Sequence, residues 1–212
     1  MTRRFSPSFR WRDFLIFYFY YRDRLKTFKK GPHRVGWKSA YNQTIRFEKL
    51  IAIDNLNHCN ILDLGCGLGG LYDFLIGQGW QGSYTGYDFL KMMVLEAKQL
   101  HPEAQHVFEY WNIFKKPLTG SWDYILMSGL FNIQLLNNWE FFKDVIYKIF
   151  PFFTHGIAFN VLAYDKLVNE PGLYYFNMDQ LVVFLNSLPN THFSIVSQYL
   201  DQDQTVYLYK KR

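Results

Sequence analysis

The segment over residues 61–70 has the sequence ILDLGCGLGG, and it constrains the fold more than any other part of the chain. The apolar run from Ile61 to Leu64 predicts a short buried strand, and the glycines after it predict a sharp turn into a helix over residues 71–78. Glycines at this spacing let the backbone approach a ligand closely, with helix N–H groups aimed at it. The segment therefore predicts a cofactor-binding turn in an α/β fold.

The rest of the chain alternates predicted strands and helices. Strands are predicted over residues 82–88, 106–111, 122–129 and 155–163, followed by a hairpin of strands over 192–200 and 205–211 with a polar turn at 201–204. Helices are predicted over residues 11–29, 39–55, 90–100, 139–150 and 179–188, the second with Ser39 as its N-cap. This order predicts a Rossmann-like, doubly wound, mostly parallel seven-stranded sheet that ends in an antiparallel hairpin.

Composition excludes several classes of protein. The chain has 212 residues, 49% of them hydrophobic, which fits one domain with a short appendage and excludes global disorder. Its two cysteines, Cys59 and Cys66, exclude a disulfide scaffold and a multi-cysteine zinc site, and they favour a cytoplasmic location. No window holds 18 consecutive apolar residues, so we expect no transmembrane helix and no membrane partner. The six histidines are scattered, and we expect no bound metal.

Charge is distributed unevenly along the chain. Residues 1–38 hold 11 basic and 2 acidic residues, a net charge of +9, whereas residues 39–212 hold 12 and 16, a net charge of −4. We therefore predict a basic, aromatic, helical arm over residues 1–38 and a cofactor-binding domain over residues 39–212. The arm has three candidate roles, which are packing on the domain, covering the active site as a lid, and binding an anionic partner.

Two acidic residues indicate which cofactor the glycine turn binds. Asp88 ends the next predicted strand, where a carboxylate can accept hydrogen bonds from both hydroxyls of a ribose. Gly65, Gly67 and Gly70 also satisfy the G-x-G-x-x-G pattern of dinucleotide-binding proteins. Asp63, however, precedes the first glycine by two residues, and a carboxylate there suits a ligand amine better than a pyrophosphate.

At these motifs the sequence resembles the class I S-adenosylmethionine-dependent methyltransferases, and in particular their small bacterial stand-alone members. ILDLGCGLGG is similar to their first motif and GYD to their second, while YWNIFKKP and WDYILMSGLFN occupy the places of their third and fourth. The resemblance covers about residues 40–212. It implies S-adenosylmethionine as cofactor and S-adenosylhomocysteine as product, with the methyl group moved by in-line displacement.

The resemblance implies a role for each residue of the glycine turn. The backbone from Gly65 to Gly67 would contact the methionine part of the cofactor, with Cys66 as a small filler and Gly69 completing the turn. Asp63 would hold the cofactor amine through water, and Asp88 would bind the ribose hydroxyls.

Further along the chain, the resemblance implies an adenine pocket. Phe89 would cover one face of the adenine, and Met92 would line the pocket. Asn112 and Ile113 lie where the family contacts the adenine edge. Asn112 replaces the commoner aspartate, and its amide can accept from the adenine amino group and donate to a ring nitrogen.

The fourth motif and one arginine bear on the methyl-transfer site. Ser128 and Gly129 would lie beside the methyl donor, and Arg46 would either pair with the cofactor carboxylate or face solvent. The [DNS]-P-P-[YF] pattern that grips a planar amine is absent, which counts against adenine or glutamine amide as the acceptor. No Pro-Cys pair supplies a nucleophile for transfer to cytosine.

Candidates for acceptor binding follow the predicted strands or lie in the arm, because ligands of open α/β sheets bind beyond the carboxyl ends of the strands. The catalytic candidates are His33, Tyr18, Asn132 and Tyr164. The substrate-binding candidates are Tyr21, Arg34, Trp37, Phe131, Asn160 and Tyr175. Core and loop packing is the alternative role for each. Together they suit a small planar or acidic acceptor.

Four functions remain open from the sequence. The first is methyl transfer to nitrogen or oxygen of a small molecule, such as a secondary metabolite. The second is an RNA methyltransferase that holds nucleic acid with its basic arm. The third is an NAD-dependent oxidoreductase, although its Tyr-x-x-x-Lys spacing at Tyr87 and Lys91 surrounds the ribose-binding acid. The fourth is a binding module without catalysis. The oligomeric state is open as well.

Overall fold

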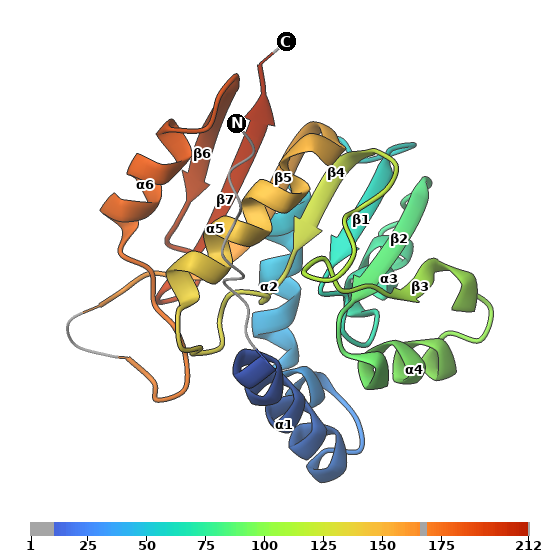
Figure 1. Ribbon diagram of the computed structural model, residues 1–212. Coiled ribbons are helices and arrows are strands. Elements are labelled where there is room, and N and C mark those ends of the chain that lie inside the picture. Colours follow the sequence, from blue (N-terminus) through green and yellow to red (C-terminus); the bar gives the residue numbers. More distant parts are fainter. Residues whose placement is uncertain (1–10, 166–168, 212) are drawn as a thin grey trace.

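A computed structural model describes residues 11–165 and 169–211, and seven strands form one sheet in it (Figure 1). The strands are β1 (Asn60–Leu64), β2 (Ser83–Asp88), β3 (Phe108–Tyr110), β4 (Trp122–Met127), β5 (Phe153–Leu162), β6 (Thr191–Val196) and β7 (Asp203–Lys210). Their order in the sheet is β3-β2-β1-β4-β5-β7-β6. The first five strands pair in parallel, and β7 lies antiparallel between β5 and β6. The predicted Rossmann-like sheet with its closing hairpin is confirmed.

Helices cover both faces of this sheet. They are α1 (Trp11–Thr27), α2 (Ala40–Ile51), α3 (Gly70–Gly77), α4 (Lys91–Leu100), α5 (Asn138–Ile149) and α6 (Met178–Asn186), with short 3₁₀ turns at η1 (Pro32–Val35), η2 (Gln105–Val107) and η3 (Phe150–Phe152). Buried side chains of α5 and α6 pack in one hydrophobic cluster, and those of α2 and α3 pack in another behind the sheet (Figure 1). None of the helices in the described ranges is both long and apolar enough to cross a membrane.

Local side chains explain where two of the helices begin. Ser39 caps α2 as predicted, because its hydroxyl accepts a hydrogen bond from the Asn42 backbone N–H at 3.1 Å. Asn177 caps α6 in the same way through the Gln180 N–H at 3.0 Å. These caps satisfy N–H groups that have no partner within the helix.

The closing hairpin differs from the prediction at its turn. The predicted polar turn at 201–204 is wrong, because β6 ends at Val196 and β7 already begins at Asp203. Gln198 has a φ of 63°, a left-handed conformation that a strand does not accommodate. Asp203 is polar but joins the buried strand because it pairs with Arg46. A charged residue therefore sits inside the sheet at the edge of the site described below.

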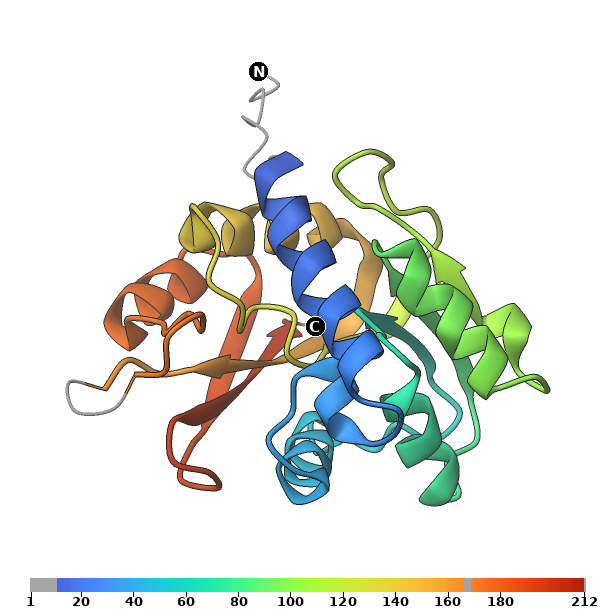
Figure 2. The same ribbon diagram turned by 90° about the horizontal axis from the view of Figure 1, so that it is seen from below.

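The arm lies across the carboxyl ends of the strands. Figure 1 shows α1 below the sheet, and Figure 2, seen from below, shows it crossing the front of the molecule. Its anchor is Phe17, which is 2% exposed and whose ring centroid lies 5.0 Å from that of Phe89 and 5.9 Å from that of Phe141. The arm therefore shares the main core of the sheet. The division of the chain at residue 38 stays a prediction.

Candidate active site

The glycine turn after β1 closes by hydrogen bonds to the neighbouring strand. The N–H groups of Gly65 and Cys66 donate to the carbonyl oxygen of Tyr87 at 2.7 and 3.1 Å. Gly65 and Gly67 have φ values of 86° and 55°, a left-handed backbone in which a side chain would be strained. Both glycines line a large cavity. The turn thus presents bare backbone to whatever binds there.

Gly69 belongs to the same turn but has a packing role. A Cβ atom at Gly69 would lie 2.7 Å from the His101 ring and 2.8 Å from the Phe108 ring. The residue also has a φ of 85° and lies outside the cavity lining. Close packing against the rings of His101 and Phe108 explains why this position is glycine. The predicted contact of Gly69 with a cofactor stays a prediction.

Two buried carboxylates line the cavity beside the turn. Asp63 accepts a hydrogen bond from the Tyr84 hydroxyl at 2.6 Å, yet burial raises its pKa to about 7. Asp88 accepts from the N–H groups of Gly67 at 3.0 Å and Leu90 at 2.8 Å, yet burial raises its pKa to about 6. A ligand that brings a positive charge or hydroxyl donors to these carboxylates would stabilise their ionised forms.

The cavity is the largest feature of the site, with a volume of about 1220 Å³. It lies where β1, β2 and β4 end, so the parallel strands deliver their C-terminal residues to one place, as open α/β sheets do. Its volume lies above the roughly 300–1,000 Å³ of typical small-molecule pockets. One drug-sized ligand would therefore leave part of the cavity unfilled.

The four residues predicted for the adenine pocket do not all line one cavity. Phe89 lines the cavity, with Phe14 and Phe17 of α1 packed against its ring. Ile113 instead lines a small neighbouring cavity that Phe89 also borders. Met92 and Asn112 lie outside both linings, and the Asn112 Oδ1 atom accepts from the Phe114 N–H at 3.0 Å. These adenine contacts stay predictions.

Arg46 is buried at the wall of the cavity, with only 7% of its surface exposed, so the solvent-facing alternative is wrong. Its Nε and Nη2 atoms donate to the two carboxylate oxygens of Asp203, the second at 2.5 Å. The Trp37 ring lies 4.6 Å from its guanidinium carbon. A Cβ atom at Gly129, where φ is 74°, would come within 2.6 Å of that ring. Trp37 therefore presses on the end of β4 and requires glycine there.

A chain of hydrogen bonds supports the cavity wall at Ser128. The Ser128 hydroxyl donates to Asn160 Oδ1 at 3.2 Å, and Asn160 Nδ2 donates to the Thr205 hydroxyl at 2.8 Å. Ser128 lines the cavity, whereas Asn160 is fully buried behind it. Because the Ser128 proton is committed to Asn160, its oxygen presents lone pairs to a ligand. Asn160 is thus placed to position Ser128 rather than to touch a substrate.

The four catalytic candidates separate into two pairs. His33 and Asn132 line the cavity, whereas Tyr18 and Tyr164 lie outside its lining and Tyr164 is 61% exposed. His33 Nδ1 lies 2.9 Å from the carbonyl oxygen of Trp37. Since a carbonyl oxygen only accepts, Nδ1 carries a proton, and the lone pair of the imidazole form is then on Nε2. Of the four, His33 is the group equipped to accept a proton.

Asn132 carries an unusual polar atom. Its side chain is 9% exposed, and its buried Oδ1 atom has no hydrogen-bond partner among the described residues. The Asn132 N–H faces the Gly129 carbonyl at 3.4 Å, so the residue closes a turn directly after β4. An unpaired buried acceptor costs about 1–3 kcal/mol. Asn132 therefore lowers the stability of the protein at a cavity-lining position, close in sequence to Ser128 and Gly129, which are predicted to lie beside the methyl donor.

Four of the substrate-binding candidates line the cavity, namely Tyr21, Arg34, Trp37 and Tyr175. Arg34 donates to Glu96 Oε1 at 2.5 Å, which ties η1 to α4. Burial raises the pKa of Tyr21, with Tyr20 and Asp88 adding to the shift, so its phenol stays protonated and is not a base.

Phe131 packs among Phe141, Phe142, Phe159 and Phe176 in the core. Phe131 therefore lies behind the wall, outside the lining.

The sequence analysis missed several lining residues. They include Ile16, Tyr20, Arg24, Gln43, Leu130, Glu170 and Asp203. Helical spacing was the available clue for α1, because positions 16, 20 and 24 follow one another along one face. Glu170 and Asp203 carry no such clue, since they reach the cavity through ion pairs with Lys38 and Arg46 from distant parts of the chain. Among the described residues, no cluster of three or more His, Cys, Asp or Glu side chains is arranged to hold a metal ion.

Comparison of the sequence with known proteins finds one partial match. No protein-family model matches the sequence. A curated relative from Mycobacterium tuberculosis (strain ATCC 25618 / H37Rv), named "Putative methyltransferase Rv1506c", is 37% identical over 76 residues. That match spans 36% of this chain and 44% of the relative, so it covers less than half of either protein.

Solved structures resemble the chain over most of its length. Magnesium protoporphyrin IX methyltransferase (ChlM) from Synechocystis PCC 6803 with bound SAH has a TM-score of 0.65 at 17% identity, covering 94% of this chain and 100% of that one. The DhpI–SAH complex has a TM-score of 0.66 at 15% identity, covering 96% and 99%. The plantazolicin methyltransferase BpumL has a TM-score of 0.57 at 14% identity, covering 81% and 87%. The chain has the fold of the class I S-adenosylmethionine-dependent methyltransferases, as its motifs imply.

Proposed function

We propose that the protein is an S-adenosylmethionine-dependent methyltransferase that acts on a nitrogen or oxygen atom of a small-molecule acceptor. The observation that carries this proposal is the grouping of Asp63, Asp88 and the bare glycine turn in one cavity. A carboxylate pair with raised pKa values suits a ligand that offers an amine to one acid and a ribose to the other. The fold of the solved methyltransferases supports the same conclusion.

When bound, the cofactor supplies an electrophilic sulfonium methyl group. The chain's own residues would then bind, orient and exclude water, effects that together are worth about 7–11 kcal/mol of a barrier. The backbone of Gly65 and Gly67 would face the methionine part, and Arg46, held by Asp203, is placed to meet its carboxylate. The glycine backbone and the Arg46 guanidinium therefore suit the methionine part of the proposed cofactor.

Acceptor chemistry is assigned to the wall opposite the glycine turn. His33 Nε2 would take the proton from an oxygen acceptor, whereas a neutral amine loses its proton after transfer and needs little help. Tyr20, Tyr21 and Trp37 make this wall aromatic. Side chains of the arm, including Ile16, Tyr20 and Arg24, line the cavity, and a cavity that the arm helps to enclose suits a small acceptor better than a polynucleotide.

Titration calorimetry with S-adenosylhomocysteine tests the proposal. The wild-type protein is expected to bind, and Asp88→Ala to bind at least about tenfold more weakly, since each hydrogen bond to a charged group contributes about 1.5–3 kcal/mol. Glu109→Ala is the matched control, because Glu109 is an exposed acid on neighbouring β3. No heat of binding with the wild type, or preferential binding of NAD, contradicts the proposal.

A further inference from the structure

Helix α1 has a second face, directed away from the cavity. Its inner side chains line the cavity, whereas Trp11, Leu15 and Phe19 follow one another four residues apart along the other side. Trp11 is 69% and Phe19 44% exposed, and Leu15 is half-buried. We name these three residues the outer stripe.

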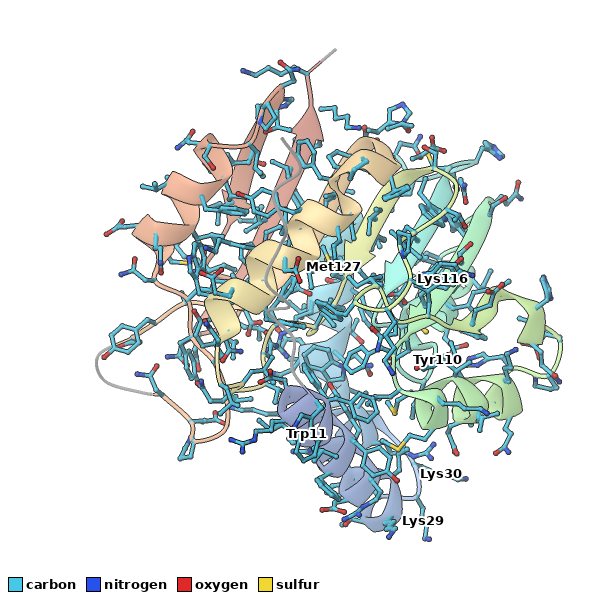
Figure 3. All side chains as sticks on the ribbon, viewed as in Figure 1. Trp11, Lys29, Lys30, Tyr110, Lys116 and Met127 are labelled. Atoms are coloured by element: carbon cyan, nitrogen blue, oxygen red, sulfur yellow. The ribbon has the colours of Figure 1, made fainter. Side chains whose placement is uncertain are left out.

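Basic residues flank the outer stripe. Arg12, Arg22 and Lys26 lie on the same side of the helix, and the exposed Lys29 and Lys30 follow its last turn. Figure 3 shows Trp11 near the first turn of α1 and the two lysines beyond its last. The Arg22 guanidinium lies 4.6 Å from the Phe19 ring, so charge and aromatic surface are adjacent.

The described part of the chain leaves this side of α1 open, since Trp11 and Phe19 are exposed. In the view from below, no other described helix or strand lies in front of α1 (Figure 2). Asp23 is the single acid on the helix apart from Asp13, which is buried on the inner side and accepts from the Leu136 N–H. Asp23 pairs with Arg22 at 2.7 Å, so the net positive charge of the rim comes from Arg12, Lys26, Lys29 and Lys30. The outer stripe therefore combines exposed apolar area with a positive rim.

We propose that the outer face of α1 docks on an anionic lipid bilayer. Helices that lie in a membrane interface present Trp, Phe and Leu on the side that enters the headgroup region, with Lys and Arg alongside to meet lipid phosphates. The outer stripe and its rim have this composition. Such docking needs no membrane-spanning segment, so it is compatible with the finding that no described helix can cross a membrane.

Two other occupants fit less well. A second copy of the chain would bring a like-charged rim against this one, and such juxtaposition opposes association. Single-stranded RNA would use phosphate contacts and stacking, but Leu15 at the centre of the stripe offers no ring to stack on.

Docking in this orientation has a consequence for access to the site. Lys29 and Lys30 border the cavity as well as the rim, so the mouth of the cavity would lie at the bilayer surface. The acceptor reaching that mouth would then be amphipathic, held partly by the lipid.

Vesicle sedimentation with the full chain tests the docking. Wild-type protein is expected to sediment with vesicles of phosphatidylcholine and phosphatidylglycerol, and to stay in the supernatant with phosphatidylcholine alone. High salt should release it, because the attraction to headgroups is screened. Equal behaviour on the two kinds of vesicle, or no binding to either, overturns the proposal.

Variants separate the stripe from the rim. Trp11→Ser/Phe19→Ser is expected to weaken vesicle binding at least about tenfold, given the apolar area lost. Lys26→Glu should weaken it by roughly fivefold or more, since each cation near the surface contributes about 1 kcal/mol. The matched controls Tyr110→Ser, Val183→Ser and Lys115→Glu remove exposed groups elsewhere and should bind like the wild type.

Two further measurements keep the outcomes distinct. A single-stranded RNA that binds more tightly than the vesicles, and loses binding in Trp11→Ser/Phe19→Ser, would identify the stripe as an RNA surface and overturn the proposal. Calorimetry with S-adenosylhomocysteine on the same variants should match the wild type. That readout tests the proposed methyltransferase function separately, because the outer stripe lies outside the cavity lining.

Discussion

The two walls of the cavity differ in how far apart in the sequence their residues lie. The wall proposed to hold the cofactor, which we name the cofactor wall, consists of the glycine turn with Asp63 and Asp88. These residues come from two adjacent strands and the loop between β1 and α3. The facing wall joins α1, η1 and the loops after β4 and β5, which meet only when the whole molecule has folded. Short-range backbone geometry thus fixes one wall, and long-range packing fixes the other. This difference leads to four predictions.

The largest effect is expected where the arm joins the core. Phe17→Ala should destabilise the protein by about 3–5 kcal/mol, the usual cost of truncating a buried phenylalanine. Phe19→Ala on the same helix exposes nothing new and should change stability by less than about 0.5 kcal/mol. Urea unfolding measures both. An unchanged main transition in Phe17→Ala, with separate early loss of the arm, would mean that the two walls fold independently.

The second prediction separates packing from ligand contact within the cofactor wall. Gly69→Ala should cost about 2–4 kcal/mol, because a left-handed backbone and close contacts to His101 and Phe108 both oppose a side chain. Gly77→Ala is the control, since nothing lies within 4 Å of a Cβ there and its φ is ordinary. Thermal unfolding compares the two variants. Below its melting temperature, Gly69→Ala should keep the affinity for S-adenosylhomocysteine, and a tenfold loss would assign Gly69 to the ligand after all.

The third prediction concerns pH and follows from the two raised carboxylates. Asp63, with a pKa of about 7, and Asp88, with a pKa of about 6, must be ionised to hold an amine and a ribose. Affinity for S-adenosylhomocysteine should therefore level off above pH 7, fall by about tenfold per pH unit between pH 7 and 6, and fall more steeply below pH 6, where both acids are protonated. The stability of the ligand-free protein should move the opposite way. Ionising these buried acids costs free energy, so their contribution declines as pH rises from the unfolded value near 4 to about 7.

Asp63→Asn provides the control for this pH dependence. It should bind more weakly at pH 8 but lose the part of the profile between pH 6 and 7 that Asp63 causes. Calorimetry at fixed ionic strength across this range measures it. A wild-type profile that is flat between pH 5 and 8 would show that neither acid meets the ligand.

The sequence predicted the grouping of the glycine turn with its two acids well because the determinants of that grouping are local. A strand, three glycines and an acid at the end of the next strand appear in order in the chain, and the structure places Asp63, Gly65 and Asp88 together. The sheet followed from alternation of strands and helices, and the resemblance to a known family then supplied the expected cofactor. Arg46 was identified as a candidate, but its partner Asp203 was assigned to a turn, because a strand 157 residues away gives no local indication.

The facing wall was predicted less well for the same physical reason. Tyr18 and Phe131 are aromatic residues in suitable segments, yet packing directs both away from the cavity. Helical phase within α1 decides between Tyr18 and Tyr20, and phase depends on which side of the helix meets the sheet. Asn160 is placed behind Ser128 by a hydrogen bond that no spacing rule anticipates.

The smallest expected effect tests the facing wall at Asn132. Its buried Oδ1 atom lacks a partner among the described residues, so replacing it with a side chain of similar shape removes a cost. Asn132→Leu should raise the melting temperature by about 2–4 °C, the equivalent of roughly 1 kcal/mol in a chain of this size. Asn138→Leu is the control, since Asn138 Oδ1 accepts from the Leu135 N–H at 2.7 Å and its loss should lower the melting temperature. If Asn132→Leu melts below the wild type, the amide holds the loop after β4 together. If it melts above the wild type and still binds S-adenosylhomocysteine, the protein is less stable than it could be because of a polar residue at a position proposed to face the acceptor.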